Sequence, residues 1–222
     1  MTIRLQKNLR ETVASGQLTS TALPLCPEIS LILLSADYPK GPLPHEEMLA
    51  VLNRPAYWAF CWASGQVLAR HLVNHPSICA GKSVLDFGAG SGVVAIAAGL
   101  TGASRVIACD LDTHALDACE ENARHNGIVV ELLPDLHELK EPVDLLIAAD
   151  VLYDRENLEW LDKLSGYARA GLIADSRIRD PAVFKGYDLV DTIEATTIPD
   201  LDEMKEFGRV SIYYREFTET CT

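Results

Sequence analysis

Three glycines at alternate positions form the stretch of this sequence best suited to chemistry. Gly88, Gly90 and Gly92 follow a predicted strand at 83–86 and precede an apolar stretch at 93–100 that predicts a helix. Glycine has no Cβ, so the main chain of such a turn can approach a ligand closely. Free N–H groups at the start of the following helix add a partial positive charge. The stretch predicts a site for a nucleotide-like ligand, although glycine-rich turns also occur without one.

An acidic residue distinguishes this turn from a dinucleotide-binding turn. Asp86 lies two positions before Gly88, and the glycines are spaced G-x-G-x-G rather than G-x-G-x-x-G. A carboxylate is unfavourable beside a pyrophosphate but suits a cationic amino-acid group. The pattern resembles motif I of the class I methyltransferases, which use S-adenosylmethionine (SAM). Both features disfavour an NAD-linked dehydrogenase.

Four aspartates lie at or just after the ends of predicted strands: Asp86, Asp110, Asp135 and Asp150. In a parallel sheet these carboxyl ends share one edge, and open α/β sheets bind ligands there. Like charges repel and their burial costs free energy, so four carboxylates are not expected to gather for stability alone. A ligand with hydroxyls, an amino group and a positive sulfonium would compensate them.

These aspartates have separate expected contacts. Asp110 lies 18 residues after the last glycine of the turn, where a carboxylate can accept from both ribose hydroxyls. Asp135 is placed to accept from the adenine amino group, and Asp86 faces the methionine amine through the turn. A helix N-cap is the alternative for any single aspartate, and Asp112 and Asp154 fit that alternative.

Strands alternate with helices along most of the chain, which predicts a parallel sheet covered on both faces. We expect strands at 83–86, 105–109, 128–133, 143–149, 172–174, 187–195 and 209–216, and helices at 92–101, 113–125 and 156–168. No clear helix separates the last two strands, so we expect an antiparallel pair. The predicted fold class is α/β: a Rossmann-like, seven-stranded, mostly parallel sheet with helices on both faces and an antiparallel C-terminal strand pair.

The 222 residues are enough for one domain with a full core. We expect a single methyltransferase domain over 1–222, in which residues 1–55 form an N-terminal extension that contributes to the substrate side. Within this extension the pattern predicts a partly helical segment at 1–22, a strand at 28–34 and a short helix at 45–52.

An aromatic cluster lies between this extension and the glycine turn. Tyr57, Trp58, Phe60 and Trp62 fall within six residues, although only 7% of the chain is aromatic. Taken alone, the cluster is explained by packing over the sheet. Its position directly before the nucleotide-binding unit favours a ligand role, and Trp62 is a candidate for the cofactor site.

The composition narrows the classes of protein to which this chain can belong. A hydrophobic content of 48% and a charged content of 23% are ordinary for a globular protein. No apolar run reaches the ~18 residues that span a membrane, and the N-terminus lacks a signal-peptide core, so we expect a cytoplasmic protein. A net charge of −13 disfavours nucleic acid and favours cationic partners, although acidity also simply gives solubility. The six scattered cysteines and six histidines predict neither disulfides nor a metal site.

Several segments together resemble a family of protein methyltransferases. They are Pro27–Ile29, Pro55–Gln66, Gly81–Gly92, Gly102–Val106 and Asp150–Asp154. Over about residues 23–176 the chain is similar to the seven-strand protein methyltransferases. It is most like the electron transfer flavoprotein β-subunit lysine methyltransferases and their bacterial relatives, and the ribosomal protein L11 methyltransferases are a related alternative. The resemblance implies SAM as the cofactor, S-adenosylhomocysteine (SAH) as its product, and a protein with a basic or lysine-containing surface as the substrate.

The predicted site has a cofactor part and a catalytic part. The cofactor residues are Trp62, Asp86, Gly88, Gly90, Gly92, Asp110, Leu111, Asp135 and Leu136. Asp150 and Tyr153 look like the family's D-x-x-Y/F signature, which implies that they border the target lysine. Lysine is a nucleophile only when neutral, and its unperturbed pKa is ~10.4. A carboxylate can orient the ammonium while the proton goes to water, and a tyrosine ring can hold the amine in line, so positioning would supply much of the acceleration. A packed core tyrosine is the alternative for Tyr153.

Two segments depart from the family pattern. After the fifth strand the chain has Ala174–Asp180 where the family has a G-D-P-x-R-like stretch, and either Arg177 or Arg179 matches its arginine. The acidic segment Pro199–Phe207 fits no pattern. The alternatives to a lysine methyltransferase are a small-molecule N- or O-methyltransferase and a non-catalytic SAM-binding protein. The glycines and Asp110 argue against the last of these.

Overall fold

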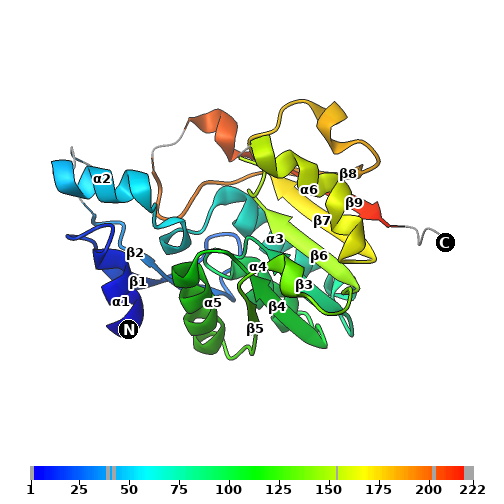
Figure 1. Cartoon of the computed structure of the whole chain (residues 1–222), viewed down its shortest axis with the longest axis horizontal. Coiled ribbons are helices and arrows are strands. Elements are labelled where there is room, and N and C mark those ends of the chain that lie inside the picture. Colours follow the sequence, from blue (N-terminus) through cyan, green and yellow to red (C-terminus); the bar gives the residue numbers. More distant parts are fainter. Residues whose placement is uncertain (1–2, 39–40, 42–43, 154, 202–203, 218–222) are drawn as a thin grey trace.

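The computed structural model describes residues 3–38, 41, 44–153, 155–201 and 204–217. Its centre is a seven-stranded sheet in the order β5-β4-β3-β6-β7-β9-β8 (Figure 1). The strands are β3 (Ser83–Phe87), β4 (Arg105–Cys109), β5 (Glu131–Leu133), β6 (Leu145–Ala149), β7 (Ala170–Asp175), β8 (Asp188–Glu194) and β9 (Arg209–Glu216). Strands β3 to β7 pair in parallel, and β9 is antiparallel to both of its neighbours. The predicted fold class is confirmed.

Helices and short 3₁₀ turns cover the sheet. The α-helices are α1 (Ile3–Arg10), α2 (His45–Asn53), α3 (Ala63–Asn74), α4 (Val93–Leu100), α5 (Thr113–His125) and α6 (Trp160–Lys163). The 3₁₀ turns are η1 (Tyr57–Ala59), η2 (Pro76–Ile78), η3 (Leu136–Glu138), η4 (Arg155–Glu159), η5 (Leu164–Gly166), η6 (Pro181–Phe184) and η7 (Lys205–Gly208).

Alternate strand residues enter two cores, one on each face of the sheet. Val84 and Ile147 pack with α3, α4 and α5 on one face. Their chain neighbours Leu85 and Leu146 pack on the other face with α6, η5 and η6. Because β6 and β7 are covered on both sides, their sequences are almost continuously apolar.

One predicted helix is wrong in its form. The segment expected as a helix at 156–168 is divided into η4, the four-residue helix α6 and η5. Asn157 turns its side chain back to donate to the carbonyl of Val151 at 2.8 Å, which ties the start of the segment to the loop after β6. Asn157, Asp162, Ser165 and Gly166 also have weak helix propensity, so a regular helix is not favoured.

The N-terminal elements gather at one end of the molecule beside α5, opposite to β8 and β9 (Figure 1). The hairpin β1 (Leu18–Ala22) and β2 (Ser30–Leu34) forms a separate antiparallel sheet. Strand β2 lies within the predicted strand at 28–34, whereas β1 falls in the segment predicted to be partly helical. The hairpin is attached to α5 by Asn122, whose buried amide accepts from Ile32 N at 2.7 Å and donates to Ser91 O at 2.9 Å.

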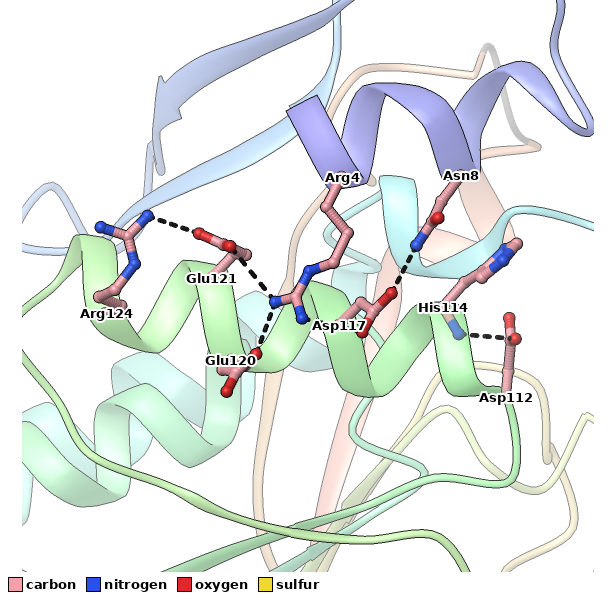
Figure 2. A network of polar contacts seen from close by, with 8 residues as sticks. All are labelled: Arg4, Asn8, Asp112, His114, Asp117, Glu120, Glu121 and Arg124. Atoms are coloured by element: carbon pink, nitrogen blue, oxygen red, sulfur yellow. Dashed lines mark hydrogen bonds and ion pairs between the residues drawn. The ribbon is translucent and has the colours of Figure 1, made fainter. Parts of the chain in front are cut away.

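Helix α1 lies across α5 through a group of polar contacts (Figure 2). Arg4 pairs with Asp117, Glu120 and Glu121, and Asn8 donates to Asp117 at 2.8 Å. Exposed ion pairs of this kind contribute little to stability. The fully buried side chains of α1, Leu5 and Leu9, supply the larger part through apolar burial.

The extension also reaches the loop that follows β4. The guanidinium of Arg54 lies 2.6 Å from Asp112, the residue that caps α5, and Thr12 donates to the carbonyl of Arg54. Residues 1–55 are thus fixed to α5 and to the start of that helix. Their contribution to the substrate side stays a prediction.

Candidate active site at the carboxyl edge of the sheet

The three glycines form a tight turn between β3 and α4. Gly88, Gly90 and Gly92 have φ values of +70°, +52° and +80°, a region that glycine occupies without a steric penalty. The N–H of Gly88 donates to the carbonyl of Cys109 at 2.9 Å, so the turn is also attached to the end of β4. Strand β3 lies between β4 and β6, which places the turn at the switch point of the sheet.

Asp110 holds the glycine turn with one carboxylate oxygen and the loop after β4 with the other. Oδ2 accepts from Gly90 N at 2.9 Å, and Oδ1 accepts from Asp112 N at 2.9 Å. Burial raises the pKa of the Asp110 carboxyl, and these two hydrogen bonds oppose the rise. The next side chain, Leu111, is 81% exposed and lies beside this carboxylate in sequence. Asp110 and Leu111 together offer a hydrogen-bond acceptor and an apolar surface directly after β4.

Asp86 lies beneath the turn rather than in it. The side chain is 1% exposed, and its Oδ2 accepts from Ala95 N in the first turn of α4 at 2.9 Å. Burial raises the pKa of the Asp86 carboxyl to about 7. The carboxyl therefore fixes the start of α4, and its expected contact with a cationic amine would have to pass through the turn.

Asp135 and Asp112 both cap a helical turn. Asp135 begins η3 and accepts from His137 N at 2.9 Å, while Asp112 begins α5 and accepts from His114 N at 3.0 Å. Leu136 is buried, so its side chain packs in the core beside Leu85. Asp154, the other residue expected as a cap, lies outside the described residues.

Asp150 joins three segments at the end of β6. Its φ of +53° makes it the one residue other than glycine with a positive φ in the part of the chain described. Oδ2 accepts from Ser64 N at the start of α3, and Oδ1 accepts from the N–H and hydroxyl of Ser176 after β7. Such strained main-chain conformations persist where the surroundings hold them, and they cluster at functional sites.

Aromatic rings from two segments meet near Asp150. Tyr153 lies with its ring centroid 5.8 Å from that of Tyr57, which in turn lies 5.7 Å from Trp62. The indole N–H of Trp62 donates to the carbonyl of Tyr57 at 3.1 Å, which fixes the ring. Tyr57 is 46% exposed and Tyr153 is 60% exposed. Accessible ring faces of this kind attract cations such as an ammonium group.

Sequence reasoning missed Asp175, the last residue of β7. It follows the predicted strand at 172–174, so the rule that found the other four aspartates also applies to it. Its side chain is 2% exposed, and Oδ1 accepts from Arg177 N at 2.8 Å and Ile178 N at 2.6 Å. Five aspartates therefore lie at this edge of the sheet.

The connection between β8 and β9 returns to the aromatic run. Cys61 and Ile198 exchange two main-chain hydrogen bonds of 2.8 Å, and Gln66 donates to the carbonyl of Thr196. Arg177 lies over the ring of Phe207 at 4.1 Å. Arg177 therefore contacts the acidic segment Pro199–Phe207, which matched no pattern. Arg179, in contrast, is exposed.

A cavity of about 400 Å³ lies elsewhere, beside β4 and β5. Its lining includes Arg105 and Glu131, the first residues of those strands, and residues 138–141, but none of the predicted site residues. In the described ranges, no group of three or more His, Cys, Asp or Glu side chains is placed to hold a metal ion.

Known proteins share this architecture. The sequence model of the family described as ribosomal protein L11 methyltransferase (PrmA) matches residues 72–155. The T. Thermophilus 16S rRNA N2 G1207 methyltransferase, solved with AdoMet and guanosine, has a TM-score of 0.60 at 10% identity, over 91% of this chain and 51% of that one. Magnesium protoporphyrin IX methyltransferase from Synechocystis PCC 6803, solved with SAH, has a TM-score of 0.55 at 16% identity, over 82% and 90%. The chain has the class I SAM-dependent methyltransferase fold.

Relatives of higher identity include lysine methyltransferases. The electron transfer flavoprotein beta subunit lysine methyltransferase of Homo sapiens is 37% identical over 161 residues, 69% of this chain and 57% of that protein. The homolog from Caenorhabditis elegans is 26% identical over 200 residues, 81% and 78% of the two chains. The ribosomal protein L11 methyltransferase of Azotobacter vinelandii is 43% identical over 91 residues, 39% and 27%. This chain spans a little over half the length of the human protein, and the predicted resemblance is confirmed.

Replacing Gly88 by alanine should destabilise the protein more than replacing Gly127. A Cβ on Gly88 would lie 2.5 Å from Cγ1 of Val151, whereas Gly127 has a similar φ of +71° with nothing within 4 Å. Both variants carry the main-chain strain, so Gly88→Ala should cost about 1–3 kcal/mol more through overpacking. Urea unfolding of both variants measures the difference, and equal losses would contradict the contact.

Ionisation of Asp86 should lower the stability of the protein as the pH rises. The folded-state pKa of about 7 lies above the unfolded value, so between the two the folded state retains a proton that the unfolded chain has lost. The contribution of Asp86 therefore decreases from about pH 4 to about pH 7. Asp86→Asn keeps an acceptor for Ala95 N and cannot ionise, so its unfolding free energy relative to the wild type should rise over this range. Parallel curves from urea unfolding at several pH values would contradict the assignment.

Proposed function

We propose that this protein is a SAM-dependent methyltransferase that transfers a methyl group to a lysine side chain of a protein. The observation that carries the proposal is the order of the strands. It places the glycine turn between Asp110, which follows β4, and Asp150, which follows β6. The matched residues 72–155 contain the glycine turn, Asp110 and Asp150. The identity to the human lysine methyltransferase supports a lysine side chain as the methyl acceptor.

The residues of the turn suit SAM as the cofactor, with SAH as the product. Because Gly88, Gly90 and Gly92 have no side chains, a ligand can approach the main chain of the turn closely, and glycine adopts their positive φ values without a steric penalty. Asp110 can accept from ribose hydroxyls, Asp135 from the adenine amine, and Leu111 can cover the base. Trp62 and Leu136 complete the proposed cofactor set, the latter through its main chain. When bound, SAM supplies an electrophilic methyl group.

The catalytic part of the proposal uses Asp150 and Tyr153. The carboxylate of Asp150 is held by Ser64 and Ser176, so it can orient an amine without rearranging. The rings of Tyr153 and Tyr57 can hold the alkyl chain and the ammonium of a lysine. Proton loss to water then leaves a neutral amine in line for attack.

The proposed partner is a protein whose target lysine lies on a basic surface, because the chain carries a net charge of −13. Electron transfer flavoprotein β-subunit and ribosomal protein L11 are the first candidates, by similarity to the named relatives. We place residues 1–55 on the substrate side and the protein in the cytoplasm, without nucleic acid or membrane partners. The described helices include none of the length and apolarity needed to cross a bilayer.

A small-molecule N- or O-methyltransferase is the second candidate. The magnesium protoporphyrin IX methyltransferase has the same fold, and function depends on the site rather than on the fold. The exposed rings of Tyr57 and Tyr153 are open enough for either acceptor.

A labelling experiment separates these candidates. The purified protein is incubated with SAM labelled on its methyl group and with lysate from cells that lack the gene. A discrete labelled band on a denaturing gel supports a protein substrate, and mass spectrometry of the band identifies the residue. Label confined to the low-mass fraction favours the small-molecule reaction, and labelling of a residue other than lysine contradicts the proposal.

Asp110→Ala should abolish measurable SAM binding, because the variant loses the ribose acceptor and the anchor of Gly90 together. Two charged hydrogen bonds correspond to a loss of roughly 100-fold or more in affinity. Asp112→Ala is the matched control, since it removes the cap of α5 and the ion pair with Arg54 but leaves the hydrogen bond between Asp110 and Gly90 N. Isothermal calorimetry measures both, and unchanged affinity in Asp110→Ala would remove the ribose assignment.

Asp150→Asn should retain SAM affinity and lose turnover by roughly 100-fold, because the amide cannot orient an ammonium as the carboxylate does. Asparagine tolerates the positive φ of +53°, so the main chain is preserved. Asp144→Asn, at the other end of β6, is the control. Single-turnover kinetics with the labelled substrate measures the effect, and normal turnover would make Asp150 purely structural.

A further inference from the structure

Two unpaired polar atoms lie in residues that flank Asp150. Among the buried side-chain nitrogen and oxygen atoms described, Ser64 Oγ and Asp175 Oδ2 are the ones without a hydrogen-bond partner. Unpaired buried polar atoms are rare, and each is destabilising because it loses its hydrogen bonds to water without gaining a partner. Ser64 donates its N–H to Asp150, and Asp175 ends the strand beside that of Asp150. Both unpaired atoms therefore belong to residues beside Asp150.

The register of the sheet sets Asp175 against Asp150. Ala149 of β6 pairs with Ala174 of β7, so Asp150 and Asp175 are the next residues along two neighbouring strands. The N–H of Asp150 donates to the carbonyl of Ala174 at 3.0 Å. The two carboxyl groups are thus presented from neighbouring strand ends.

Asp175 orders the turn that carries Ser176. Its Oδ1 accepts from the N–H groups of Arg177 and Ile178, which closes a turn around Ser176. Ser176 then donates both its N–H, at 3.2 Å, and its hydroxyl, at 2.8 Å, to Oδ1 of Asp150. A chain of contacts runs from Asp175 through Ser176 to the carboxylate that orients the amine.

We propose that Asp175 is a positioning residue for the methyl-transfer site, which acts through Ser176 to hold the carboxylate of Asp150. The inference rests on the proposed function and adds to it a residue that touches neither cofactor nor substrate. Asp175 does this from a buried position. Its burial and the charge of Asp150 raise its pKa, while its two main-chain hydrogen bonds and Arg177 oppose the rise.

Two variants of Asp175 test this role. Asp175→Asn keeps the side-chain oxygen that accepts from Arg177 N and Ile178 N, whereas Asp175→Ala removes it. Asp180→Ala is the matched control, because Asp180 caps the next turn in the same way, through Ala182 N at 2.9 Å, but is exposed and remote from the Asp150 contacts.

The first readout needs no activity. Amide hydrogen exchange of Ser64 and Ser176, the two main-chain donors to Asp150, should become faster in Asp175→Ala and stay unchanged in Asp175→Asn and Asp180→Ala. Unchanged exchange in Asp175→Ala would overturn the proposal, whether or not the protein methylates lysine.

The second readout is turnover with SAM and purified electron transfer flavoprotein β-subunit or ribosomal protein L11. Asp175→Ala should lower kcat by roughly 10- to 100-fold with little change in SAM affinity, and Asp175→Asn should restore it. An Asp175→Asn variant as impaired as Asp175→Ala would overturn the positioning role of this acceptor. Faster exchange in Asp175→Ala combined with an inactive wild type would instead reject the proposed acceptors and leave the positioning of Asp150 supported.

Discussion

The need to hold five carboxyl groups at one edge of a sheet governs this structure. Asp86, Asp110, Asp135, Asp150 and Asp175 each accept from main-chain N–H groups within the described residues. Those N–H groups belong to the turns and helix starts that follow the parallel strands. The carboxylates therefore organise the loops, and the loops compensate the carboxylates, before any ligand is present. A cofactor with a positive centre meets an edge that is already ordered.

The N-terminal extension acts on the same edge from outside. Asn122 links the β1–β2 hairpin to the carbonyl of Ser91 in the glycine turn, and Arg54 pairs with the aspartate that begins α5. The extension therefore supports the proposed cofactor loops as much as any substrate surface. The packing of α1 on α5 is stabilised mainly by its buried leucines. The exposed ion pairs of Arg4 affect the orientation of α1 more than its stability.

Much of this arrangement could be predicted from local patterns. The strands β3, β4 and β6 are apolar runs that each precede an aspartate, so the edge, the turn and the places of Asp110 and Asp150 follow from the chain alone. The antiparallel C-terminal pair follows from the lack of a clear helical pattern between the last two predicted strands. Asp175 could have been found by the same rule, since it also ends an apolar strand.

Features that depend on distant contacts could not be predicted in this way. The break-up of the segment at 156–168 depends on Asn157 reaching Val151, and the pairing of Cys61 with Ile198 joins residues far apart in the chain. The positive φ of Asp150 results from Ser64 and Ser176, which come from two other elements. The residues near position 150 in the sequence do not predict Ser64 and Ser176 as its partners.

The close approach of Gly88 to Val151 has a consequence for how this site can change over generations. The two residues share one small volume, since a Cβ on residue 88 would overlap the side chain at 151. One belongs to the turn proposed to bind the cofactor, and the other follows the aspartate proposed to orient the acceptor. A lineage that alters the acceptor loop by enlarging position 151 has no free space at position 88 to absorb the change. A change in the proposed acceptor loop at position 151 is thereby coupled to the proposed cofactor turn, whereas Tyr57 and the β8–β9 connection do not share this contact.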